Sequence, residues 1–496
     1  MDPRTPVLVG AGQVTHRPGD DGSPSPLELM VRAARAAEED AGVPGLLVKA
    51  GSVAVVDLFS WLVPDPAALL ASELGIAPRE SVRAVRGGTG PIALLGDLCA
   101  KIAAGDLDVA LLAGGEVVTT FMKAASRGED PGWPTQPEGT APTREVGEDR
   151  APNHPAEEAA GLLAPIFFYP LFEQAVRGAE GRGVDEHQAW LGELWARFAA
   201  VARDNPHAWT RDAPTDPAAI SRPGPGNRLV SAPYTKLLNA NIQVDQGAAL
   251  VLCSAQAAQD AGVPRERWVF VHGTAGAHDH WHVAQRHELH RSPAIAACAA
   301  ALREHTGTDP AQADLLDLYS CFPSAVQIGA GELGIDLGTD ERAPTVTGGL
   351  TFAGGPANDY CTHAIASLAT RLREAGDGAT GLATGVGWYL TKHALATFGT
   401  APPPTPFADL HPQDVVDVQP SREVVQGEAA RGPVETYTAL YDRDGTPTLG
   451  IVATVLEDGR RALGRSEDGA TVADLVGGDP LGREVSVSAD GRFTLA

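Results

Sequence analysis

The sequence predicts an α/β protein with two β/α halves of similar plan, an inserted cap and a small C-terminal β-domain. Short apolar runs, glycine-rich turns and helical patterns alternate over residues 6–112 and again over residues 269–399. Residues 119–227 interrupt this alternation with proline-rich and charged segments. Beyond a proline-rich stretch at 401–406, the apolar residues recur with a period of two, which is typical of β-hairpins. This succession indicates an α/β core followed by a separate β-unit.

The chain opens with a strand-like run at Pro6–Val9, followed by Gly10 and Gly12. A dinucleotide-binding loop would need a third glycine at position 15, where Thr15 stands, so a Rossmann fold is not indicated. A helix is predicted over 27–41, because Gly42 follows its last apolar residue.

Residues 81–112 show the strand–turn–helix–strand pattern most clearly. Strands are predicted at 81–85 and 108–112, with a glycine-rich turn and a helix over 91–104 between them. Proline suits the first turn of a helix, and Pro91 stands there. Further helices are predicted within the insertion, over 165–179 and 185–204.

The similar plan of the two halves indicates an internal duplication. The predicted units are an N-terminal half (1–118 and 228–262), an inserted loop or cap domain (119–227), a C-terminal half (263–400), a proline-rich linker (401–410) and a small β-domain (411–496). An OB-like fold is one option for the last unit, because it combines short strands with Gly/Asp turns.

The composition excludes several classes of function. The chain has 496 residues, 43% of them hydrophobic, so it can bury a large core. Its formal net charge of −25 disfavours nucleic acid and anionic membranes as partners. We expect a cytoplasmic protein, since neither a run of about 20 apolar residues nor a signal-peptide pattern is present. The five cysteines form no CxxC pair and are expected to be free thiols.

Five segments resemble a known family in their order and spacing. They are AAGDLDVALLAGGE (103–116), ARDNPHAWTRDAPTDPAAIS (202–221), VDQGAALVL (244–252), GGLTFAGGP (348–356) and ATGVG (383–387). The chain thereby resembles the thiolase superfamily, especially its sterol-carrier-protein-type branch and the thiolase-like proteins with an added C-terminal domain. The resemblance implies the thiolase fold, with duplicated halves in a layered αβαβα arrangement. It also implies a CoA thioester as the ligand and no further cofactor.

The side chains that thiolases use for Claisen chemistry are missing. The resemblance places the nucleophilic cysteine at Gly87, its activating histidine at Gly355 and the second cysteine at Ala383. Loss of a nucleophile together with its base lowers a rate by about 10⁶, which argues against acyl transfer through a covalent intermediate. The resemblance also assigns an oxyanion hole to the backbone N–H groups of Gly87 and Gly385, which need no side chain.

Two other residues are candidates for replacement chemistry. Tyr319 stands where thiolases bind the catalytic water, and thiolase-fold retro-aldolases of the steroid side chain resemble the chain in placing a tyrosine there. A phenol at this position would exchange a proton with a β-hydroxyl or an enolate during retro-aldol cleavage of a 3-hydroxyacyl-CoA. His363, on the helix after GGLTFAGGP, is a candidate base. For each residue the alternative is a structural role, as a buried tyrosine or a packed histidine.

Ligand-binding and assembly predictions rest on basic residues and histidines. Three basic residues just after the insertion are candidates for the CoA phosphates: Arg222, Arg228 and Lys236. The histidine-rich run 278–290 lacks a closed ligand set, so no metal site is predicted. Arg83 and Arg86 lie on the strand through which thiolases dimerise, and charge at a sheet edge discourages pairing. We expect a monomer, with a dimer as the alternative.

Three functions remain open at this point. The leading hypothesis is non-covalent acyl-CoA chemistry, such as retro-aldol C–C cleavage in lipid or steroid metabolism. A catalytically inactive acyl-CoA-binding protein is the first alternative. An acetyl-CoA acyltransferase is the second, and it requires that the motif register given above is wrong.

Overall fold

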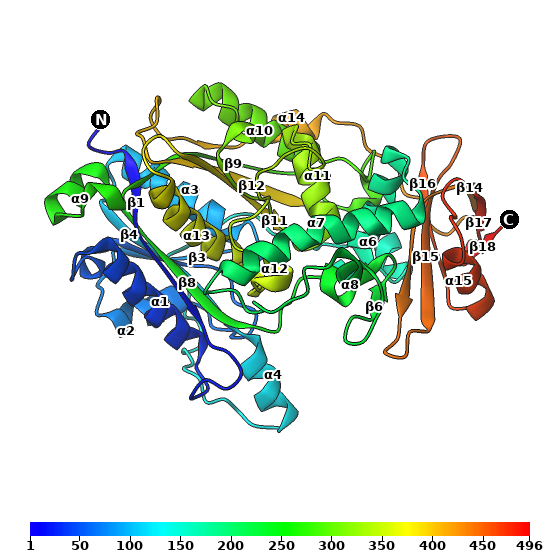
Figure 1. Cartoon of the computed structure of the whole chain (residues 1–496), viewed down its shortest axis with the longest axis horizontal. Helices are drawn as coiled ribbons and strands as arrows, with labels where there is room; N and C mark the ends of the chain where they lie inside the picture. The colour runs from blue at the N-terminus through cyan, green and yellow to red at the C-terminus, as the bar shows by residue number, and fades with distance from the viewer.

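The computed structural model describes residues 1–496 and contains one large mixed sheet between helical layers (Figure 1). The sheet has 11 strands in the order β10-β11-β12-β9-β1-β8-β4-β2-β3-β5, with β13 paired to β9 beside this path. Their bounds are β1 (Pro6–Thr15), β2 (Ser52–Val55), β3 (Glu80–Ala84), β4 (Val109–Val117), β5 (Arg144–Val146), β8 (Asp245–Ser254), β9 (Val269–His278), β10 (Leu315–Asp317), β11 (Thr380–Gly387), β12 (Lys392–Gly399) and β13 (Asp409–Leu410). The two halves meet where β1 and β9 pair antiparallel at Val7 and Leu8.

Helices form three layers around the two halves of the sheet. Those of the core are α1 (Pro26–Ala41), α2 (Pro66–Leu74), α3 (Gly90–Ala104), α9 (Ala255–Ala261), α10 (Pro293–Thr306), α11 (Pro323–Leu333), α12 (Gly349–Phe352) and α13 (Tyr360–Ala375). Helices α3 and α13 lie between the halves and contact strands of both, whereas α1 and α2 cover the outer face of one half and α10 that of the other. The predicted αβαβα layering is therefore confirmed.

Glycines in β1 allow the strand to lie directly against helix α1. A Cβ atom on Gly10 would stand 2.1 Å from the Ala37 carbonyl oxygen, and one on Gly12 would stand 2.1 Å from the Ala33 carbonyl oxygen. Small alanines on the facing side of α1 complete this close contact. The Gly-x-Gly pattern thus serves strand–helix packing, and strand β1 continues through it to Thr15.

The insertion contributes helices and also one strand of the core sheet. Its helices are α4 (Val118–Ser126), α5 (Pro155–Ala159), α6 (Pro165–Glu180), α7 (Val184–Asp204) and α8 (Pro217–Ser221). The two helices predicted from sequence are confirmed as α6 and α7. Strand β5, by contrast, was not predicted, and it pairs in parallel with β3. The insertion is therefore partly integrated into the thiolase-like sheet.

Strand β5 covers the sheet edge that the sequence suggested would be bare. Arg83 on β3 pairs with Glu145 on β5. Arg144 donates hydrogen bonds to Glu80 at 3.0 Å and to Asp97 at 2.7 Å. These ion pairs hold the added strand in place, so the arginine at this edge favours pairing within the chain. The expectation of an edge protected by exposed charge is corrected accordingly.

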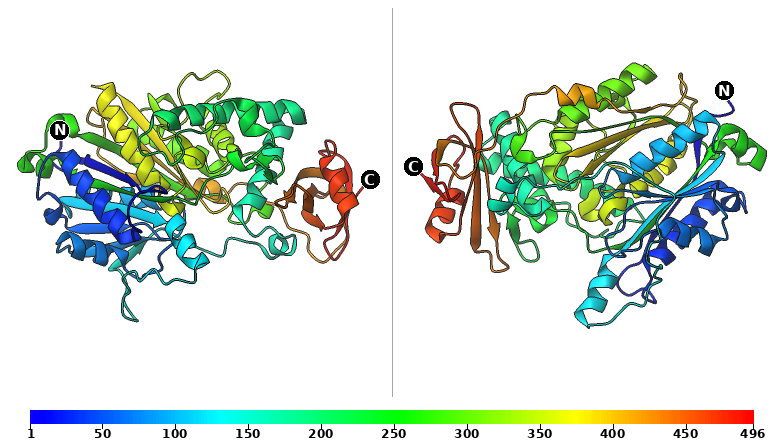
Figure 2. Two further views of the ribbon diagram at one scale, coloured as in Figure 1. Left: turned by 60° about the horizontal axis from the view of Figure 1, so that its bottom comes forward. Right: turned by 180° about the vertical axis from the view of Figure 1, so that it is seen from behind.

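The C-terminal residues form a second sheet in the order β16-β15-β14-β17-β18, at one end of the molecule (Figure 2). Its elements are α14 (Gln413–Asp417), β14 (Ala430–Tyr441), β15 (Pro447–Val455), β16 (Arg461–Ser466), α15 (Gly469–Val476), β17 (Glu484–Val487) and β18 (Phe493–Leu495). The hairpin β6 (Leu229–Ser231) and β7 (Tyr234–Thr235) joins this sheet through β14. The predicted linker is not a free spacer, since its β13 pairs with β9 of the core.

A buried arginine fastens the C-terminal domain to the core. Arg461 is fully buried and donates to the carbonyl oxygens of Ala284, at 2.8 Å, and Arg286. Its charge is balanced by Glu435, with an Nε–Oε2 distance of 2.7 Å. A second pair joins Arg177 of α6 to Asp479 of the C-terminal domain at 2.6 Å.

No helix in the structure is both long enough and apolar enough to cross a membrane.

Replacement of Arg144 by glutamate tests the role of β5 as an edge cover. In Arg144→Glu, the new carboxylate would lie next to those of Glu80 and Asp97. Because three carboxylates repel one another, we expect β5 to detach from β3. The free edge should then support self-association, and light scattering should show a concentration-dependent dimer, with a loss of about 1–3 kcal/mol in stability. The control is Arg150→Glu at an exposed pair with Glu148, which should behave as wild type. A strictly monomeric Arg144→Glu variant would contradict this role.

Candidate functional site

Two glycine-rich loops meet at the centre of the molecule. The turn before α3 contains Gly87, with φ 138°, and Gly88, while β11 contributes Gly385 and Gly387. A Cβ atom on Gly87 would stand 3.5 Å from the Gly387 Cα, and one on Gly385 would stand 3.2 Å from the Gly88 carbonyl oxygen. The structure therefore brings together the two loops to which the sequence assigned the oxyanion hole.

The side chain of Lys392 fills the space in front of Gly87. Its Cε atom lies 2.9 Å from the position of a Cβ on Gly87. Its ammonium donates to the carbonyl oxygens of Arg86 and, at 3.0 Å, of Glu148. Burial lowers the pKa of Lys392, although Asp149 lies 3.8 Å from its Nζ atom. A cysteine at position 87 would require the end of the Lys392 side chain to move. No motif in the sequence indicated this lysine.

Tyr319 lies over the other glycine of the turn. Its hydroxyl oxygen is 2.3 Å from the position of a Cβ on Gly88, so only glycine is accommodated there. The Tyr319 backbone N–H donates to Thr384 Oγ1 at 2.8 Å, and the ring meets Tyr360 edge-on at 5.5 Å. Burial raises the pKa of Tyr319 well above its usual range, so the phenol stays protonated at pH 7.

Cys361 closes the same turn from helix α13. Its thiol donates to the Gly88 carbonyl oxygen at 3.1 Å. Burial raises the pKa of Cys361 well above its usual range, so the sulfur remains a thiol. A buried, protonated sulfur is a packing group and a weak donor here, because only a thiolate is an effective nucleophile.

Gly355 and Ala383 lie in different environments from Gly87. The Gly355 N–H donates to the Asn241 carbonyl oxygen at 2.9 Å, and a Cβ on Gly355 would meet its nearest neighbours at 3.4 Å. Ala383 is fully buried in β11, in register with Asp317 of β10 and Ala396 of β12. Position 355 therefore has ordinary room for a larger side chain.

One of the two predicted oxyanion donors is already engaged. The Gly87 N–H donates to Asn358 Oδ1 at 3.1 Å. The amide of Asn358 is itself fixed by a 3.0 Å hydrogen bond from its Nδ2 to the Asp57 carbonyl oxygen. A ligand oxygen at this donor would have to displace the Asn358 side chain.

His363 lies away from Tyr319, in a buried polar region over β1. Its Nδ1 is 2.9 Å from Gln13 Oε1, and its Nε2 is 3.5 Å from Asp359 Oδ2. None of its polar contacts is to Tyr319 or to the glycine loops. Burial lowers the pKa of His363 to about 3, so the ring is neutral at pH 7. The structure thus places the His363 ring with Gln13 and Asp359, and its role as a base stays a prediction.

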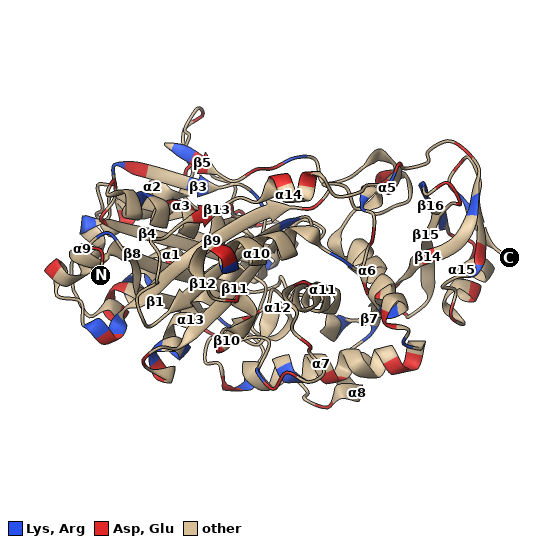
Figure 3. Cartoon of the chain, turned by 90° about the horizontal axis from the view of Figure 1, so that it is seen from above, with Lys and Arg blue, Asp and Glu red and all other residues tan.

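A cavity of about 720 Å³ lies beside the loop of Gly355. Its wall includes Lys123 and Lys236 and no carboxylate. Elsewhere along the chain, Asp and Glu residues occur at many positions in helices, strands and loops (Figure 3). Asn241 and Ala240 line its inner end, where Asn241 accepts from the Gly355 N–H and the Ala240 N–H donates to Cys321. This lysine cavity is therefore next to the loops of the candidate site.

Of the three basic residues predicted to hold CoA phosphates, only Lys236 lines the lysine cavity. Arg222 and Arg228 are exposed nearby, and the Lys236 N–H donates to the Arg228 carbonyl oxygen at 2.9 Å. Lys123, on α4, was not predicted, because a lone lysine in a helical segment carries no distinctive pattern. Elsewhere, no group of three or more His, Cys, Asp or Glu side chains is arranged to hold a metal ion.

Comparisons with known proteins place this architecture in a family. Over 100% of both chains, the molecule is similar to a monomeric SCP2-thiolase-like protein type 1 from Mycobacterium smegmatis, with 31% identity and a TM-score of 0.85. The chain belongs to the SCP2-thiolase-like proteins of type 1. A family model for the "Thiolase-like protein type 1 additional C-terminal domain" matches residues 411–492. The resemblance inferred from the sequence motifs is thereby confirmed.

Two other solved structures share the fold of this SCP2-thiolase-like protein at lower identity. Acetyl-CoA acetyltransferase from Syntrophomonas wolfei has 17% identity and a TM-score of 0.57, with 80% of this chain and 99% of that chain covered. The Ltp2-ChsH2(DUF35) aldolase has 19% identity and a TM-score of 0.60, with 79% and 98% covered. No curated protein sequence matches the chain.

The two degenerate glycines of this SCP2-thiolase-like protein should respond differently to substitution. Gly87→Ala combines a φ of 138° with the Lys392 contact, so we expect a loss of about 1–3 kcal/mol in stability. Gly355→Ala adds a methyl group at ordinary van der Waals distances, so its stability should stay within about 1 kcal/mol of wild type. Urea denaturation measures both, and equal losses would contradict the contrast described here.

Proposed function

We propose that this protein binds a CoA thioester in the lysine cavity and cleaves a carbon–carbon bond of its acyl group by retro-aldol chemistry, with Tyr319 as proton donor. The observation that carries the proposal is the neutral Tyr319 phenol directly over the glycine turn at Gly88. The proposal requires no cofactor besides the CoA moiety, and we propose that the protein acts as a monomer.

The lysine cavity suits the anionic end of CoA. A net charge of −25 repels phosphates in general, so an acid-free wall with Lys123 and Lys236 is a local exception. Ammonium groups bind phosphate as point charges. The partly exposed indole of Trp209 also lines the cavity and offers a face for the adenine ring. A volume of about 720 Å³ is within the range of small-molecule sites.

The proposed reaction fits the groups that remain at the turn. The proton of the β-hydroxyl leaves, the bond between the α- and β-carbons breaks, and its electron pair moves into a thioester enolate. The α-carbon of the enolate then takes a proton. Tyr319 donates that proton from its protonated phenol, and the phenolate so formed recovers the proton that the β-hydroxyl released. Covalent acyl transfer is not proposed, because no cysteine or histidine occupies positions 87, 355 or 383.

A second candidate is an acyl-CoA-binding protein without catalytic activity. It is favoured by the 3.1 Å hydrogen bond from the Gly87 N–H to Asn358, which occupies an oxyanion donor. Both candidates predict binding of acyl-CoA, whereas only the first predicts turnover.

The location of the CoA site can be tested with charge reversals. Lys236→Glu and Lys123→Glu should each weaken CoA binding by about ten-fold or more, because each replaces a cation of the cavity by an anion. The matched control is Arg222→Glu, an exposed residue of the same region outside the cavity wall, which should change the affinity by less than about three-fold. Calorimetric titration measures all three affinities. If Arg222→Glu weakened CoA binding more than the two lysine variants do, the CoA site would lie outside the lysine cavity.

The chemistry can be tested at Tyr319. A panel of 3-hydroxyacyl-CoAs should yield ketone or aldehyde products with the wild-type protein, and Tyr319→Phe should lower turnover by about 10²-fold or more, with CoA affinity unchanged. Product formation is followed by mass spectrometry. Unchanged turnover in Tyr319→Phe would remove Tyr319 from the reaction, and CoA binding without turnover on the whole panel would favour the inactive binder.

A further inference from the structure

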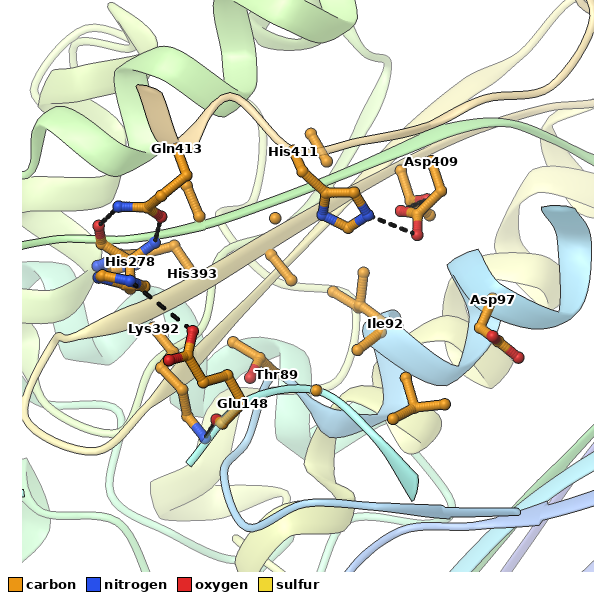
Figure 4. A pocket seen from close by; sticks show the side chains of 18 of the residues that line it. Thr89, Ile92, Asp97, Glu148, His278, Lys392, His393, Asp409, His411 and Gln413 are labelled. Atoms are coloured by element: carbon orange, nitrogen blue, oxygen red, sulfur yellow. Dashed lines mark hydrogen bonds and ion pairs between the residues drawn. The ribbon is translucent and has the colours of Figure 1, made fainter. Parts of the chain in front are cut away.

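A second cavity lies at the N-terminus of helix α3, with a volume of about 530 Å³ (Figure 4). Its walls are α3, β9, β12 and two strands from outside the duplicated halves, β5 and β13. It shares no lining residue with the lysine cavity. We call it the helix-end cavity, and the function proposed above makes no use of it.

Thr89 is an unpartnered polar residue in the wall of the helix-end cavity. It is the N-cap of α3, a helix of 15 residues, yet its hydroxyl makes no capping hydrogen bond. Its exposure is only 9%, and its side chain lies among those that line the cavity (Figure 4). The Thr89 backbone is already helical, with φ −76° and ψ −15°, and in this conformation its hydroxyl does not cap its own helix. Here the free hydroxyl stands beside the positive end of the helix dipole.

The carboxylates of the wall already have cationic partners. Their closest polar contacts are Asp97 with Arg144 at 2.7 Å, Glu148 with Arg150 at 2.6 Å, Asp409 with His411 at 3.2 Å, and Glu145 with Arg83. The acidic side chains therefore leave little uncompensated negative charge at the cavity.

His411 faces α3 from the opposite wall. Its ring extends from the segment after β13 over Ile92 (Figure 4). The hydrogen bond and charge of Asp409 raise the pKa of His411, which favours the imidazolium form. Between His411 and the helix end lie apolar surfaces from Ile92, Ala275 and Ala394. The cavity therefore combines donors for an anion with room for an apolar body.

We propose that the helix-end cavity binds a small organic acid, with its carboxylate at the Thr89 hydroxyl beside the start of α3. Its apolar body would lie against Ile92 and Ala394, with its far edge toward the His411 ring. A carboxylate would accept the free Thr89 hydroxyl and benefit from the helix dipole. This ligand is separate from the CoA thioester, and the inference does not depend on the function proposed above.

Benzoate and its neutral isostere benzamide test the proposal by calorimetric or NMR titration of the full-length protein. Benzoate should bind at millimolar concentration or below, and benzamide at least about ten-fold more weakly, because it lacks the charge. Thr89→Val should weaken benzoate binding by about ten-fold, whereas Thr89→Ser, which keeps the hydroxyl, should stay within about three-fold of wild type.

His411→Ala provides a second variant at an exposed side chain, so folding is not at risk. It should also weaken benzoate binding by several-fold, and thermal unfolding checks that each variant is folded. Equal affinities for benzoate and benzamide would overturn the proposal. So would wild-type affinity in a folded Thr89→Val variant, or the absence of benzoate binding at millimolar concentration.

Discussion

The close approach of two glycine loops is the constraint on which the candidate site depends. Without side chains at Gly87 and Gly88, the turn before α3 can face β11 at van der Waals distance, with Lys392 on one side and the Tyr319 hydroxyl on the other. Any Cβ atom on the turn would displace one of these two groups. The turn therefore lacks reactive side chains, and the space in front of it is occupied by other residues of the chain.

The same turn is connected to the periphery of the molecule by charged groups. Lys392 binds the backbone of the turn and of Glu148, just beyond β5, while Arg144 and Arg83 hold β5 on the core sheet. At the other end of the chain, Arg461 fastens the C-terminal domain through carbonyl oxygens of the core. In this strongly acidic protein, these four cationic side chains bind segments that are distant in sequence to one another.

Much of the fold could be predicted from the sequence, because long periodic segments have only one compatible secondary structure. Helices α1, α3, α6 and α7 carry such patterns, and their predicted bounds agree with the structure to within one residue. The predicted strand over 108–112 corresponds to the first part of β4. Strands β5 and β13 could not be predicted, because they contain three and two residues and lie in proline-rich surroundings. Each becomes a strand only through pairing with another strand, β5 with β3 and β13 with β9.

Prediction of the site was less complete, for physical reasons that differ between residues. The motif register assigned Gly87 and Gly385 to one site, and the structure brings their loops together with Tyr319 beside them, while the roles of these residues stay predictions. The contacts of His363 could not be predicted, because its orientation depends on which side of α13 faces β1. Lys392 was missed, because only the three-dimensional arrangement brings it from β12 to a turn some 300 residues earlier.

The tie between Lys392 and the residues after β5 has a consequence for the candidate site. Glu148, just beyond β5, supplies one of the two carbonyl oxygens that hold the Lys392 ammonium, and β5 itself pairs with β3. A change that released β5 from this edge would therefore also loosen the side chain that fills the space in front of Gly87. The covering of the sheet edge and the filling of that space are thus coupled through one backbone carbonyl group.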